Sequence, residues 1–149
     1  MSDLVYGKIK IKDSKYEMVE KAAAILEENG FELQYISTDG ETDYDMGIHA
    51  YNTRFNSFEE YYKIAPGEYV DNVQGNMYTV SWKFTHFVYK NEEENLEAMM
   101  TVLMGAPEDG SPPAVTFCFF SIDKKRDYNT DFAEKTKAKL EVLNSQASN

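Results

Sequence analysis

The most regular alternation of apolar and polar positions runs through residues 76–90, NMYTVSWKFTHFVYK. Successive side chains of an extended chain point to opposite faces, so this pattern predicts a β-strand with one buried and one largely solvated face. We expect the rest of the chain to pack against the apolar face. That face would carry Tyr78, Val80, Trp82, Phe84, His86 and Val88, and the other Met77, Thr79, Ser81, Lys83, Thr85 and Phe87.

Shorter apolar patterns predict four more strands, at residues 5–12, 31–37, 46–51 and 114–122. The first has lysines on its outer face, which discourage pairing between sheet edges. The second and third should form a hairpin with an acidic tip, because the connection between them is rich in turn residues and carboxylates. The last, AVTFCFFSI, is apolar on both faces and predicts a central, buried strand.

Two helices are predicted by capping signals and apolar spacing. Residues 14–29 open with Ser14 and Glu17 in a capping box, continue with a helical apolar stripe and end at Asn29-Gly30. Residues 57–60 repeat the box, so a short helix with an aromatic face should follow and end at Pro66-Gly67.

Two more helices are predicted in the second half of the chain. Asn91 has the form of an N-cap followed by Glu92, Glu93 and Glu94 in the first turn, where the helix dipole favours negative charge. The stripe Leu96, Met99, Met100 and Leu103 would continue this helix to Gly105. Residues 127–143 predict a peripheral last helix, and residues 144–149 a frayed tail.

The element order is therefore β-α-β-β-(short α)-β-α-β-α. Hairpin-like neighbours mixed with helices predict an α+β fold, a two-layer sandwich with a mostly antiparallel sheet and helices on one face. The best match is a ferredoxin-like or split-βαβ core of two βαβ units plus the C-terminal helix. Residues 1–143 would form one acidic α+β domain, and 144–149 its tail.

Composition supports a folded chain of ordinary domain size. The 149 residues are 42% hydrophobic and 14% aromatic, which is too apolar for disorder. The one cysteine, Cys118, cannot form an internal disulfide, and no apolar run approaches the length of a membrane span. We therefore expect a cytoplasmic protein with no membrane partner.

The net charge of −11 is concentrated in the middle of the chain. Residues 1–21 carry five lysines and four acids, and residues 124–149 carry six basic residues and four acids. Residues 22–123 carry 18 acids and four basic residues. A field of this sign repels nucleic-acid phosphates and attracts basic partners, although solubility alone also explains it.

The acidic connection at residues 39–45 does not match a specific metal site. Its carboxylates alternate, so in an extended segment they would form a row of negative charge: Asp39, Glu41, Asp43 and Asp45. An EF-hand loop would need glycine where Tyr44 stands and a bidentate glutamate where Ala50 stands. An electrostatic contact surface or a solvated loop is the better interpretation, and no metal or cofactor is expected.

Catalytic patterns are weak. His49 and His86 could in principle act as acid and base, but their sequence contexts match no catalytic motif. Cys118 lies between bulky aromatics, where burial raises the pKa of a thiol and makes it inert. The eight glycines are dispersed and form no phosphate loop.

The sequence therefore favours a non-enzymatic protein that occludes a basic, nucleic-acid-binding surface of a partner, without contacting nucleic acid itself. Immunity proteins against nuclease toxins and small phage-encoded anti-defence inhibitors work in this way, and the likeness is one of charge and size. There are two alternatives: a small hydrolase or nucleotide-processing enzyme that uses His49 and His86, and a small-ligand sensor or sequestering module with an aromatic pocket. The predicted contact residues are Asp39, Glu41, Asp43, Tyr44, Asp45, Tyr61, Tyr62, Glu92, Glu93 and Glu94.

Overall fold

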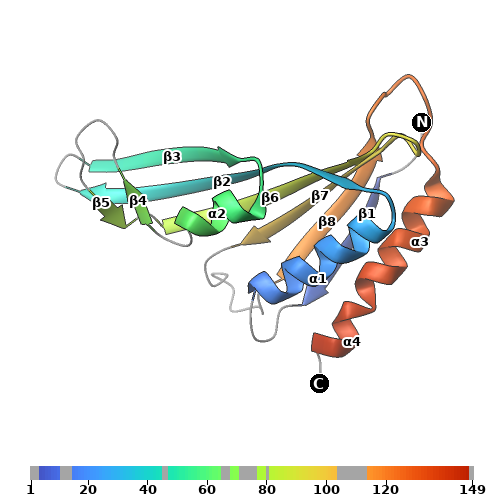
Figure 1. The fold of residues 1–149 in the computed structure, drawn as a ribbon, viewed down its shortest axis with the longest axis horizontal. Coiled ribbons are helices and arrows are strands. Elements are labelled where there is room, and N and C mark those ends of the chain that lie inside the picture. The colour runs from blue at the N-terminus through green and yellow to red at the C-terminus, as the bar shows by residue number, and fades with distance from the viewer. Residues whose placement is uncertain are drawn as a thin grey trace.

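The computed structural model describes residues 4–10, 15–44, 47–64, 68–70, 77–79, 81–103 and 114–147. Twelve elements occur in these ranges (Figure 1). In chain order they are β1 (Val5–Lys10), α1 (Lys15–Glu28), β2 (Glu32–Tyr44), β3 (Gly47–Phe55), α2 (Phe58–Ile64), β4 (Glu68–Val70), β5 (Met77–Thr79), β6 (Ser81–Asn91), β7 (Leu96–Leu103), β8 (Ala114–Ser121), α3 (Thr130–Glu141) and α4 (Leu143–Ala147).

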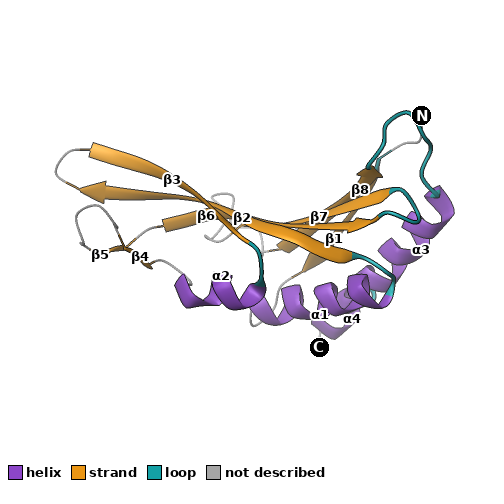
Figure 2. Ribbon diagram, turned by 45° about the horizontal axis from the view of Figure 1, so that its top comes forward, coloured by secondary structure: helices purple, strands orange, loops and turns teal. Residues whose placement is uncertain are grey.

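Six of the strands form one sheet in the order β1-β8-β7-β6-β2-β3, and each neighbouring pair is antiparallel. Figure 2 shows the helices on one side of this sheet, while the other side is open. The predicted α+β two-layer arrangement with helices on one face is confirmed. α1 connects β1 to β2, and three strands lie between these two in the sheet, while the finer ferredoxin-like or split-βαβ assignment stays a prediction.

The core lies between the helices and the covered face of the sheet. Val5, Gly7 and Ile9 of β1 alternate inward, and β8 supplies the buried rings of Phe117 and Phe119 beside them. Gly7 is needed here because a Cβ at this position would clash with the Phe117 ring. The helices complete the layer with small and branched side chains, namely Val19, Ala22, Ala23 and Leu26 of α1 and Ala133, Thr136 and Leu140 of α3.

The segment 76–90 departs from its predicted form in two ways. It contributes two strands, because β5 pairs with β4 in a separate two-stranded sheet while β6 pairs with β2 and β7. Its covered face is also the opposite one: Phe87 and Tyr89 are fully buried toward the helices, whereas His86 is half-buried on the open face. The bulky rings decide the face, since the α2 aromatics pack on Phe87. The side chains of Trp82 and Phe84 lie outside the described set.

The helix predicted for residues 91–103 is wrong. Residues 92–95 form a turn, and Leu96–Leu103 is strand β7, paired on both sides. The segment LEAMMTVL has apolar residues at both the helical and the strand spacing, and the buried set alternates as in a strand: Leu96, Ala98, Met100 and Val102. Pairing with β6 and β8 on both sides satisfies the backbone and buries this alternating set against the core, so tertiary contacts override the local helical signal.

The acidic segment 39–45 and the C-terminal segment also differ from the predictions. The predicted hairpin is present, but β2 continues to Tyr44, so residues 39–44 belong to the strand and not to a turn. At the C-terminus, Leu143–Ala147 form the short helix α4, which includes the first four residues of the predicted 144–149 tail. Asn144 of this helix accepts a hydrogen bond from the Lys10 backbone N–H (2.6 Å) and donates one to the Lys8 carbonyl (3.0 Å). The helices predicted at 14–29, after residue 57 and within 127–143 are confirmed as α1, α2 and α3.

Candidate functional site

The two acidic segments predicted to meet a partner lie at opposite ends of the molecule. Glu32 at the start of β2 pairs with Lys90, so the turn at residues 92–94 lies beside this end. The β2–β3 hairpin ends at Tyr44 and Gly47, twelve residues further along, which is roughly 40 Å at about 3.3 Å per residue. Figure 1 shows this separation. The structure therefore does not combine the two segments into one surface.

The turn at residues 92–94 belongs to a larger acidic surface that the sequence analysis missed. Five exposed glutamates from the end of α1, the start of β2 and the turn gather here, and we call them the acidic end surface: Glu27, Glu28, Glu32, Glu92 and Glu93. A polar hollow of about 290 Å³ lies among them, lined by Gly30, Glu32, Gln34, Lys90, Asn91, Glu92 and Glu93. Within the described ranges none of the five glutamates forms an ion pair. Their field is therefore only partly offset by nearby Lys90 and Lys139.

Buried asparagines fix the backbone beneath this surface. The Asn91 side chain donates to the Asn29 carbonyl (3.1 Å) and accepts from the Glu94 backbone N–H (3.1 Å). The Asn29 side chain donates to the Ile25 carbonyl (2.7 Å) and accepts from the Lys139 ammonium group (2.7 Å). The end of α1, the turn and α3 are thus held together by direct hydrogen bonds. An asparagine after a helix or inside a turn is the sequence signal that could have indicated this network.

Asn95 ties the same turn to the segment before α3. It is 3% exposed and has a left-handed backbone (φ 57°). Its amide nitrogen donates to the carbonyls of Arg126 (2.8 Å) and Asp123 (3.2 Å), and its oxygen accepts from the Asp123 N–H (2.9 Å). Asparagine tolerates this backbone region better than other non-glycine residues, which explains its place at the turn.

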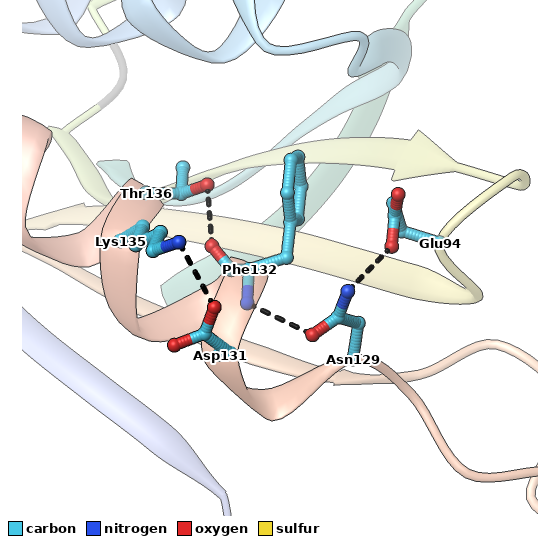
Figure 3. Close-up of polar contacts among 6 residues, drawn as sticks. All are labelled: Glu94, Asn129, Asp131, Phe132, Lys135 and Thr136. Atoms are coloured by element: carbon cyan, nitrogen blue, oxygen red, sulfur yellow. Dashed lines mark hydrogen bonds and ion pairs between the residues drawn. The ribbon is translucent and has the colours of Figure 1, made fainter.

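Glu94 has a structural contact that its two neighbours lack. Its carboxylate accepts a hydrogen bond from the Asn129 side chain (3.1 Å), while the oxygen of Asn129 caps α3 by accepting from the Phe132 N–H (3.0 Å), as Figure 3 shows. Glu94 is also less exposed than Glu92 and Glu93. Of the three predicted contact glutamates, two therefore face solvent and one connects the turn to α3.

Of the three predicted contact tyrosines, the structure describes the side chain of Tyr61, which lies in the core. Tyr61 is 2% exposed, and its ring makes edge contacts with Phe87 (5.8 Å) and Phe55 (5.6 Å). Its assignment as a contact residue is therefore corrected to a core position, because α2 turns its aromatic face onto the sheet. Asp45 lies outside the described residues, and so do the side chains of Tyr44, Tyr62, Asp39, Glu41 and Asp43.

The structure does not bring the two histidines together. His86 pairs with Ser37 and His49 with Thr42, so they are five residues apart along β2, roughly 17 Å, on strands that flank it. The Nδ1 atom of His86 lies 2.9 Å from the Thr101 hydroxyl. Among the described residues no group of three or more His, Cys, Asp or Glu side chains could hold a metal ion.

Cys118 lies on the open face of β8, where it is half-buried. Burial raises the pKa of its thiol above the ordinary value, and the Glu97 carboxylate raises it further. Because the thiolate is the nucleophile, alkylation by iodoacetamide at pH 8 should be slower in the folded protein than in urea, and should rise about tenfold per pH unit below the pKa. Glu97→Gln should lower this pKa and speed alkylation about twofold, with Glu93→Gln as the control. Equal rates for Glu97→Gln and the parent would contradict the assigned cause.

No helix in the described ranges is long and apolar enough to cross a membrane. Neither hollow at the acidic end is lined by an aromatic side chain, including the larger one of about 430 Å³ between α1 and the α3–α4 junction.

Comparison with protein-family models, curated proteins and solved structures finds no significant match.

Proposed function

We propose that this protein is a non-enzymatic binding protein that holds and occludes a basic surface of a partner protein, as an inhibitor of the immunity or anti-defence type does. The observation that carries the proposal is the acidic end surface, where five exposed glutamates lie at the end of α1, the start of β2 and the turn, and three of them, Glu32, Glu92 and Glu93, line one polar hollow. A partner that uses its basic surface to bind nucleic acid would lose that surface on binding. The proposal includes a cytoplasmic setting and no direct contact with nucleic acid.

The arrangement suits electrostatic recognition. Carboxylates gathered on one surface raise the local concentration of a cationic partner and speed its association. Salt weakens this effect, because charges more than about 8 Å apart are largely screened at physiological ionic strength. The asparagine contacts fix the turn and the end of α1 before a partner arrives. Less backbone ordering is then required on binding, which favours affinity.

The test removes two charges from the surface without disturbing the frame. Glu92→Gln/Glu93→Gln should lower the association rate of a lysine-rich peptide about three- to tenfold at low ionic strength, because the peptide is steered by the local field. At about 0.5 M salt the variant and the parent should converge. Stopped-flow fluorescence with a labelled deca-lysine peptide measures both rates.

The matched control is Glu134→Gln/Glu141→Gln, which removes the same charge from α3 and leaves the five glutamates of the acidic end surface in place. A control that slows association as much as the Glu92/Glu93 variant would show that net charge alone attracts the peptide. That result would contradict a specific acidic site. Affinity capture at low and high salt then identifies the natural partner, which should be basic and should be released by salt.

A further inference from the structure

The two edges of the six-stranded sheet are protected to different degrees. β1, at one edge, has six residues with Lys8 and Lys10 exposed. The Asn144 side chain forms two hydrogen bonds with its outer backbone groups, as a paired strand would. Lysines, short length and a covering contact are the ways in which proteins prevent unwanted pairing at an edge. β1 is therefore a closed edge.

β3, at the other edge, shows none of these protections among the residues that the structure describes. It has nine residues, GIHAYNTRF, with no proline and no lysine, and Arg54 near its end is its one Lys or Arg residue. Within the described ranges it pairs with β2 alone, from Tyr44 and Gly47 through to Ile36 and Phe55, and the register does not shift. A long, straight edge strand without a bulge presents a row of backbone donors and acceptors suited to an added strand.

We propose that β3 accepts an extended, basic segment of the partner protein as an added strand of the sheet. This inference rests on the proposed function for the sign of the partner's charge. Three acids of β2, Asp39, Glu41 and Asp43, pair in register with Asn52, Ala50 and Ile48 of β3. The backbone of an added strand would lie two strand spacings, about 10 Å, from the backbone of β2. The long side chains of lysine and arginine can reach across part of this distance.

Charge also selects among possible occupants. A second copy of this chain, paired β3 to β3, would place two sets of these three acids on either side of the junction against two arginines, which opposes association. A basic segment meets the opposite field. In strand addition, backbone hydrogen bonds supply affinity and alternate side chains supply specificity, so a lysine or arginine at every second position fits best.

The test uses a nine-residue peptide that alternates lysine and valine. Isothermal titration should show binding, and hydrogen exchange should slow at alternate β3 amides, those that point away from β2. The control peptide has the same sequence with N-methyl groups on alternate amides, which keeps the charge and removes the donors. It should bind at least tenfold more weakly, because strand addition depends on those donors.

Two proline variants form a matched pair. Neighbouring residues of a strand point their N–H groups to opposite edges. Of the two variants Ala50→Pro and Tyr51→Pro, one therefore removes a donor to β2 and the other removes a donor that points away from β2. The variant that loses the outward donor should keep the fold, as judged by circular dichroism, and should lose peptide binding about tenfold. Full binding by that folded variant would overturn the edge inference.

The outcomes separate this inference from the proposed function. Equal binding of the methylated and unmethylated peptides would overturn strand addition and leave the acidic binding function standing. Stronger binding of an alternating glutamate–valine peptide with slowed β3 exchange would contradict the basic partner. Dimerisation through β3 in sedimentation experiments would replace the partner segment by a second copy and overturn the inference as stated.

Discussion

Replacing Phe87 by alanine is expected to lower the free energy of unfolding by about 4 kcal/mol, the range for removing a large ring from a packed core. Phe87 is fully buried at the centre of an aromatic cluster, stacked on Phe58 at 5.4 Å and in edge contact with Tyr61 at 5.8 Å. These rings are the main attachment of α2 to the sheet. Urea denaturation measures the loss, and hydrogen exchange should show α2 opening more readily than α1 or α3.

Met99→Ala is the matched control for this prediction. Met99 lies on the open face of the neighbouring strand, paired with Val88, and is partly exposed. Its truncation leaves no closed cavity, so the loss should be about 1 kcal/mol. Equal losses for the two variants would contradict the assignment of the Phe87 face as the core face of β6.

The second large effect is expected at Asn95. Asn95→Ala should lower the free energy of unfolding by about 3 kcal/mol, because it removes a buried side chain and leaves the part-buried Asp123 N–H and Arg126 carbonyl without this partner. It also places alanine in a left-handed backbone conformation, which costs about 1 kcal/mol. Chemical denaturation monitored by fluorescence measures the change.

Asn95→Gly separates the two contributions. Glycine tolerates the positive φ, so this variant should be about 1 kcal/mol more stable than Asn95→Ala while still lacking the side-chain hydrogen bonds. Asn129→Ala, which removes the exposed N-cap of α3, should cost about 1 kcal/mol and serves as the reference for an ordinary capping contact. If Asn95→Ala lowers the free energy of unfolding no more than Asn129→Ala does, the hydrogen bonds of Asn95 are not a main support of the turn.

The local signals of α1, α2 and α3 were sufficient to predict these helices, because capping residues and apolar spacing act within one element. They failed for β7, where Leu96, Met99, Met100 and Leu103 match a helix although Leu96, Ala98, Met100 and Val102 are the buried set. Two paired neighbours decide between these periods, and pairing partners more than a dozen residues away leave no local trace. For the same reason the wrong face of β6 was predicted to be buried, since α2, which is distant in sequence, determines which face is covered.

The candidate site was predictable in part. Glu92 and Glu93 are exposed, as their charge suggested, but the other members of the acidic end surface, Glu27, Glu28 and Glu32, come from α1 and β2. Only the register between β2 and β6 brings these residues to one end of the molecule. Tyr61 was misassigned because the local sequence of a short helix is the same whether its aromatic residues contact a partner or pack into the core.

The position of β1 has a consequence for how the chain folds. β1 gains its ladder from β8, with Val5 opposite Phe119, and its outer contact from Asn144. More than a hundred residues therefore have to be synthesised and brought back before this strand acquires a neighbour, and closing so long a loop costs entropy before any pairing is gained. During translation the β2–β3 hairpin, whose contacts are local, emerges first, and the β6–β7–β8 meander follows when β8 is complete. β1 then completes the sheet as a late addition, clamped from outside by α4.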